Sequence, residues 1–127
     1  MPTLQPVFVY GSLKRGCSNH LFLERATFFG EAWTVERYEL LVDEYPLVYE
    51  GNAVGPIRGE VYGVDQPLLT RIDLLEQHPD FYRRRKVPVR LDDGRILEAW
   101  LYFFPRRLGV AVPSGDWSPE CPGPDHD

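Results

Sequence analysis

The sequence lacks the segments that would place it in a membrane or direct it to export. Its 127 residues contain no apolar run that approaches the length of a membrane span. Residues 1–6 have neither the basic start nor the apolar stretch of a signal peptide. We therefore expect a protein that neither crosses a membrane nor is exported by a signal peptide.

Cysteine is scarce, with only Cys17 and Cys121 in the chain. Two cysteines are too few for a disulfide framework, so a reducing cytoplasm is the expected location. Cys17 and His20 could form half of a zinc site, but no second pair lies at ligand spacing, and His78 and His126 are isolated. We predict no metal site. Nothing in the sequence supports a nucleophilic Cys17–His20 dyad, and Cys17 is interpreted as a loop or helix-start residue.

Basic residues are also in the minority, with 14 lysines and arginines against 19 acids and a net charge of −5. Residues 113–127 carry four acids and no base, so the rest of the chain is near −1. A nearly neutral body argues against a nucleic-acid binder that works by neutralising phosphates. Residues 113–127 also hold four prolines, which predicts an irregular acidic tail after a single domain over residues 1–112.

What the chain does contain favours strands. Aromatic residues make up 13% of it, with 12 prolines and 11 glycines. Strands are expected at residues 7–10, 28–35, 38–42, 45–49, 59–64, 83–91 and 95–104, with a short Asp-Gly hairpin turn between the last two. A helix is expected at 68–76, capped by Asp65 and ended by Pro79, and one or two helical turns at 21–26. With no βαβ alternation, the prediction is an α+β fold, a small mixed β-barrel with a few short peripheral helices.

The strand at 7–10 runs directly into a glycine turn. Gly11 and Gly16 permit backbone conformations that other residues avoid, and successive N–H groups in such a turn can form an anion-binding concavity. Ser12 would add a hydroxyl donor. An ordinary strand-to-loop corner is the alternative interpretation. A phosphate-binding loop is set aside because Cys17 and Ser18 replace its Lys-Ser/Thr pair.

Glu76 stands out on a helical wheel of the segment at 68–76. At about 100° per residue, it falls inside the apolar arc of Leu69, Ile72 and Leu75, where a solvated glutamate does not belong. Desolvation and the negative end of the helix dipole would both raise its pKa, as general acid–base chemistry requires. The alternative is a frayed helix end, at which the side chain reaches water.

The segment after this helix brings Tyr82 back at the start of a strand, where it could hydrogen-bond a ligand or act as an ordinary packing aromatic. Residues 83–86 are all basic, but on a strand they alternate between faces and do not form one patch. We interpret them as solvated charges, with one possible inward partner for a carboxylate.

Several of these segments together resemble the gamma-glutamylcyclotransferase-like superfamily, most closely its short gamma-glutamylamine cyclotransferase branch. They are residues 9–16, 73–76, Pro79 with 82–83, 19–20, 45–48 and 59–62. The resemblance implies a small mixed β-barrel. It also implies that the turn at Tyr10, Gly11, Ser12 and Leu13 binds a glutamyl group and that Glu76 is the acid–base residue.

The chemistry implied by the resemblance is an intramolecular cyclisation. The α-amino group of a γ-glutamyl amine attacks its own γ-carbonyl, which releases 5-oxoproline and a free amine and requires no metal or organic cofactor. Substrate contacts are expected from the region of residues 45–47 and from side chains near Tyr82 and Tyr102. Two other readings stay open: a non-catalytic small-molecule binder of the same fold, and a tailoring enzyme that removes a γ-glutamyl group from a biosynthetic intermediate. The leaving amine and the oligomeric state are not predicted.

Overall fold

The computed structural model describes residues 3–11, 13, 14, 17, 20–78 and 80–117. Its main element is a sheet of five strands that closes on itself in the order β1-β5-β2-β6-β7. These strands are β1 (Gln5–Val9), β2 (Thr27–Thr34), β5 (Arg58–Val64), β6 (Arg83–Leu91) and β7 (Ile96–Phe103). All neighbours pair antiparallel except β1 and β7, which meet in parallel where Val7 lies opposite Trp100. The predicted small mixed fold of strands with a peripheral helix is confirmed.

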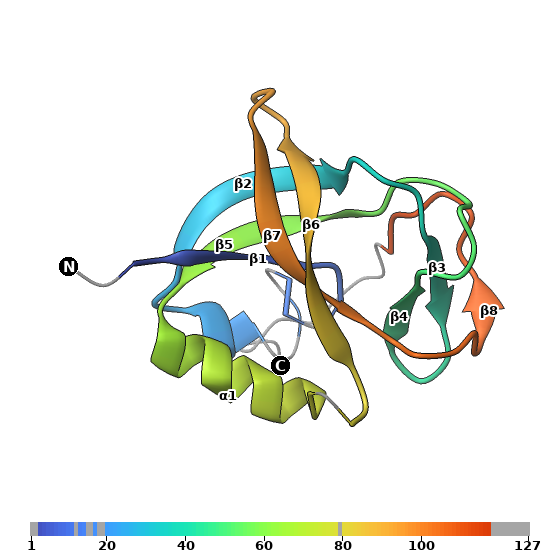
Figure 1. Ribbon diagram of the computed structural model, residues 1–127, viewed down its shortest axis with the longest axis horizontal. Coiled ribbons are helices and arrows are strands. Elements are labelled where there is room, and N and C mark those ends of the chain that lie inside the picture. Colours follow the sequence, from blue (N-terminus) through green and yellow to red (C-terminus); the bar gives the residue numbers. More distant parts are fainter. Residues whose placement is uncertain (1–2, 12, 15–16, 18–19, 79, 118–127) are drawn as a thin grey trace, which may run out of the picture.

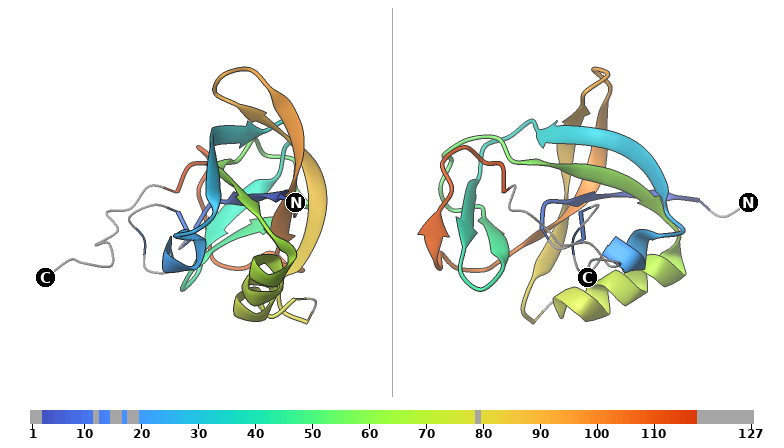
Figure 2. Two further views of the ribbon diagram at one scale, coloured as in Figure 1. Left: turned by 90° about the vertical axis from the view of Figure 1, so that its left-hand side faces the viewer. Right: turned by 180° about the vertical axis from the view of Figure 1, so that it is seen from behind.

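A second, three-stranded sheet lies beside the barrel, as Figures 1 and 2 show. It has the order β4-β3-β8 and consists of β3 (Glu39–Val42), β4 (Pro46–Tyr49) and β8 (Val110–Ala111). Pro46 starts the edge strand, as its missing N–H predicts. Strand β8 was not predicted from the sequence. The segment after it is fixed to the body, since Gly115 accepts a hydrogen bond from the N–H of Arg58 and Trp117 packs against the core.

Helix α1 (Gln66–Glu76) packs along the lower side of the barrel in Figure 1. The Asp65 side chain accepts a hydrogen bond from the N–H of Leu68, which confirms the predicted cap. The helix ends at Gln77, whose left-handed backbone (φ 56°) directs its N–H back to the carbonyls of Asp73 and Leu74. Pro79, the predicted terminator, lies outside the described residues. The turns expected at 21–26 form a shorter 3₁₀ helix, η1 (His20–Leu23).

The hydrophobic core has two main parts. One fills the barrel and includes Phe8, Val61 and Leu101. The other lies between the barrel and α1, where Leu69 and Ile72 are buried against residues of β1, β5 and β7. The second part matters for the site because it fixes the rotation of α1 about its axis, and therefore the direction in which Glu76 points.

Two further features of the described residues concern membrane-spanning helices and cysteines. No helix among them combines the length and the apolar character needed to cross a lipid bilayer. Cys17 is disulfide-bonded, and none of the described cysteines is free. The sequence did not predict this bond.

Candidate active site

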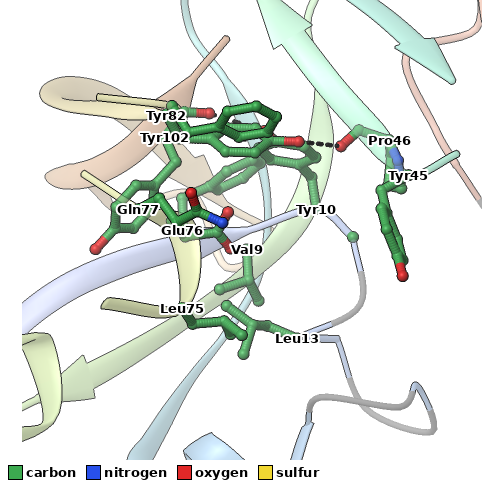
Figure 3. Close-up of a pocket in the computed structure, with 13 residues that line it drawn as sticks. Val9, Tyr10, Leu13, Tyr45, Pro46, Leu75, Glu76, Gln77, Tyr82 and Tyr102 are labelled. Atoms are coloured by element: carbon green, nitrogen blue, oxygen red, sulfur yellow. Dashed lines mark hydrogen bonds between the residues drawn. The ribbon is translucent and has the colours of Figure 1, made fainter. Parts of the chain in front are cut away.

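One cavity, of about 280 Å³, lies between the end of β1, the C-terminal end of α1 and the start of β4. Figure 3 shows its lining, to which Glu76 contributes the carboxyl group. The lining residues are Phe8, Val9, Tyr10, Gly11, Leu13, Tyr45, Pro46, Leu75, Glu76, Gln77, Phe81, Tyr82 and Tyr102. The cavity therefore brings the glycine turn and Glu76, far apart in sequence, to one place.

Glu76 occupies the last residue of α1 and faces this cavity rather than bulk solvent. Desolvation by burial raises the pKa of Glu76 from 4.5 to about 7. Its carboxyl group accepts no hydrogen bond from any side chain in the described part of the chain, so nothing offsets that desolvation. Glu76 is therefore divided between its two protonation states near neutral pH, as an acid–base group should be.

Three tyrosines surround this carboxyl, and each directs its hydroxyl proton elsewhere. Tyr10 donates to the main-chain oxygen of Tyr102 at 2.8 Å, and Tyr82 donates to the carbonyl of Pro46 at 3.4 Å (Figure 3). Burial, and then the nearby charge of Glu76, raise the pKa of Tyr82 to about 12. Burial also raises the pKa of Tyr10 and of Tyr102. All three phenols are therefore neutral at physiological pH.

The turn opposite Glu76 is held by a hydrogen bond from the N–H of Lys14 to the carbonyl of Gly11, at 3.0 Å. Within the described residues, neither Gly11 nor Leu13 donates its main-chain N–H to another main-chain group. Gly11 also packs closely against Pro46, which lines the same cavity. A Cβ atom there would lie 2.8 Å from Cγ of Pro46, so a larger residue would require the proline ring to move. Ser12, the predicted hydroxyl donor, lies outside the described residues.

An aromatic cluster forms the wall next to Tyr82. The rings of Phe81, Tyr82 and Phe104 meet pairwise edge-on, with centroids 5.1–5.6 Å apart. Phe81 and Tyr45 are both largely exposed at the cavity. Phe81 was not predicted as a site residue. Its position beside Tyr82, as a second aromatic in a proline-containing loop, is the signal that could have identified it.

The side chains of neighbouring basic residues on β6 point to opposite faces of the strand, as predicted. Arg85 pairs with exposed Glu50, while Arg84 turns inward and binds Asp73 on α1.

The His20 ring lies 3.0 Å, Nδ1 to oxygen, from the carbonyl of Leu13. No group of histidine, cysteine and acidic residues suited to a metal ion occurs among the described residues.

Comparisons with known proteins identify a family that covers most of the chain. A family model described as gamma-glutamyl cyclotransferase, AIG2-like, matches residues 7–119. This chain belongs to that family. The matched residues include the turn at β1 and Glu76.

Individual relatives extend the match over most of the chain. A Methanocaldococcus jannaschii protein provisionally named a gamma-glutamylcyclotransferase is 49% identical over 115 residues, which cover 90% of this chain and 96% of the relative. A Bos taurus protein named gamma-glutamylaminecyclotransferase is 40% identical over 109 residues, covering 78% of this chain and 65% of the relative.

A solved structure shares the fold. The crystal structure of an AIG2-like protein from Mus musculus superposes with a TM-score of 0.73 at 31% identity, and covers 80% of this chain and 77% of that one. Sequence and fold therefore both support membership of the cyclotransferase family.

Proposed function

We propose that this protein is a cyclotransferase that cleaves a γ-glutamyl amide or amine and releases 5-oxoproline and a free amine. One observation supports the proposal: a carboxyl group with a pKa of about 7 shares a cavity with a glycine turn. Family membership adds the reaction type, since relatives carry the name gamma-glutamylaminecyclotransferase or gamma-glutamylcyclotransferase. No cofactor takes part in the proposed reaction.

The reaction is a lactam closure in which Glu76 carries the protons. Its carboxylate accepts a proton from the α-ammonium group, and the neutral amine attacks the γ-carbonyl to form the new C–N bond. Glu76 gives this first proton to the departing nitrogen as the original amide C–N bond breaks. Once ionised again, Glu76 accepts the second proton of the attacking nitrogen, which becomes the lactam N–H, and passes that proton to the released amine. Proton transfer of this kind typically contributes about 10²–10⁴-fold to the rate.

The turn at Tyr10, Gly11, Ser12 and Leu13 would hold the glutamyl part of the substrate. Main-chain N–H groups at Gly11 and Leu13 are suited to the α-carboxylate or to the oxygen that becomes negative during attack, and hydrogen bonds to charged groups contribute about 1.5–3 kcal/mol each. Because attack is intramolecular, the cavity mainly has to hold the chain folded. Well-oriented intramolecular reactions reach effective molarities of about 10⁵–10⁸ M.

The cavity wall suggests where the leaving amine lies. Tyr45, Phe81 and Tyr82 line the cavity and two of them are exposed, so they are placed to contact the part of the substrate beyond the γ-amide. A cytoplasmic location, a small-molecule partner and the lack of a nucleic-acid partner remain predictions of the sequence.

The test is a panel of three γ-glutamyl compounds assayed in parallel for 5-oxoproline. γ-Glutamyl-ε-lysine, γ-glutamyl-alanine and glutathione differ only in the leaving group. The proposal expects release from at least one, with γ-glutamyl-ε-lysine favoured. If none releases 5-oxoproline while the purified protein still binds 5-oxoproline in a calorimeter, the protein is a binder and the proposal fails.

A further inference from the structure

A chain of polar contacts runs from the surface of β6 to the cavity wall without touching Glu76. Arg84 donates to Asp73 from Nε (2.8 Å) and Nη2 (3.1 Å), and its guanidinium lies over the ring of Trp100 at 4.1 Å. The hydroxyl of Tyr102 donates to Oδ1 of Asp73 at 2.5 Å. Tyr102 lines the cavity and Asp73 does not, so this hydrogen bond lets Asp73 hold a lining residue in place from outside the cavity.

We propose that Asp73 is a positioning residue: by accepting the hydroxyl proton of Tyr102, it keeps this phenol from hydrogen-bonding to Glu76. The role of Glu76 as the acid–base group rests on the function proposed above. The arrangement of Asp73, Tyr102 and Glu76 does not depend on it.

Helix geometry makes Glu76 the carboxyl group to which Tyr102 could donate if Asp73 were absent. Residues three apart on a helix share a face, with Cβ atoms about 5–6 Å apart, so Asp73 and Glu76 present their carboxyl groups to the same side of α1. The charge of Glu76 already affects Tyr102, whose pKa it helps to raise. A phenol released from Asp73 therefore has a second carboxyl group within one helical turn.

A hydrogen bond from Tyr102 would change the chemistry of Glu76. Donation to a carboxylate stabilises its charged form and lowers its pKa. Glu76 has a pKa of about 7 because desolvation acts on it unopposed. With a donor, the carboxylate would become a weaker base at neutral pH and would take the α-ammonium proton less readily.

Two other tyrosines of the cavity and the nearby His78 already have hydrogen-bond partners. Tyr10 on β1 donates to the carbonyl of Tyr102, and Tyr82 donates to that of Pro46. His78, after the helix, accepts from the N–H of Arg84 at Nδ1, and its ring meets Tyr102 edge-on. Arg84 itself is held by Asp73. Removal of Asp73 therefore releases two donors, Tyr102 and Arg84, and an experiment must separate them.

The experiment titrates the Glu76 carboxyl carbon by ¹³C NMR in purified protein without substrate, with the signal assigned through Glu76→Gln. Asp73→Ala is expected to lower the pKa of Glu76 by about one unit. Asp73→Asn keeps an oxygen that accepts from Tyr102, so its effect should be smaller. In the double variant Asp73→Ala/Tyr102→Phe, the released hydroxyl is gone and the pKa should return most of the way to that of the wild type.

The matched control is Asp92→Ala, which removes an aspartate from another bidentate arginine pair, with Arg58 at 2.7 Å. Asp92 lies in the connection between β6 and β7, and Figure 1 shows this end of the hairpin away from α1. This variant should leave the pKa of Glu76 unchanged. Two results would overturn the proposal: no fall in Asp73→Ala, or a fall in the double variant as large as in Asp73→Ala. The second result would assign the effect to the lost charge of Asp73 and the released Arg84 rather than to the Tyr102 hydroxyl. Because no turnover is measured, failure of the cyclotransferase proposal would not alter either result.

Discussion

Asp73 and Glu76 lie three residues apart on one helix, but their pKa values are shifted in opposite directions from the ordinary values. Partial burial alone would raise the pKa of Asp73, but hydrogen bonds from Arg84 and Tyr102 outweigh it and hold the pKa below its ordinary value. Burial without such donors raises the pKa of Glu76 to about 7. Two carboxyl groups with environments that separate their pKa values can divide structural and acid–base roles between them.

The first prediction concerns the pH dependence of turnover. Glu76 must be ionised in the free enzyme to accept a proton, so kcat/KM should fall about tenfold per pH unit below an apparent pKa near 7. A pH–rate profile from 5 to 9 on the preferred substrate measures this. An acid limb near 4.5, the ordinary value for a glutamate, would show that Glu76 is solvated in the working enzyme.

The second prediction concerns stability. Because the pKa of Glu76 is higher in the folded than in the unfolded protein, its contribution to stability is fully present below about pH 4.5 and is lost as the pH rises through 7. Glu76→Gln has no such charge, so it should be the more stable protein at pH 8, by about 3 kcal/mol. The two should converge at pH 4. Urea unfolding at both pH values measures the difference, and an equal gap at each would contradict a buried carboxyl.

The third prediction concerns the strand that carries the turn. A Cβ atom at Gly59 would lie 2.4 Å from the carbonyl oxygen of Val9 and 2.5 Å from Cζ of Phe8, so Gly59→Ala should force β5 away from β1. Overpacking of this kind typically costs about 1–3 kcal/mol. It should also reduce turnover, since β1 leads into the turn.

Gly55 offers the matched control for that change. A Cβ atom there meets nothing within 4 Å, so Gly55→Ala should leave the free energy of unfolding almost unchanged. Thermal unfolding of both variants tests the pair. Equal Tm values for the two would mean that β1 and β5 tolerate a side chain at their contact.

The sequence was sufficient where local rules decide the structure. The cap at Asp65, the Asp-Gly hairpin and the placement of Glu76 on the apolar arc of α1 all follow from short-range patterns, and the structure confirms each. The inward partner for a carboxylate expected within residues 83–86 is Arg84.

The sequence predicted less of the structure where contacts between distant segments decide it. Strand β8 has two residues and exists because it pairs with β3, almost 70 residues earlier. The sequence pattern assigned no role to Asp73. Its acceptance of the Tyr102 proton depends on α1 lying against β7, and no local pattern encodes that placement.

The most direct test of the account is Glu76→Gln, assayed for both turnover and binding. The amide keeps the size of the side chain but cannot exchange the proton, so 5-oxoproline release should fall by about 10²–10⁴-fold. Affinity for 5-oxoproline, measured by calorimetry, should stay close to that of the wild type because the turn at β1 is intact. Wild-type turnover by Glu76→Gln would contradict the central claim that this buried carboxyl carries the proton.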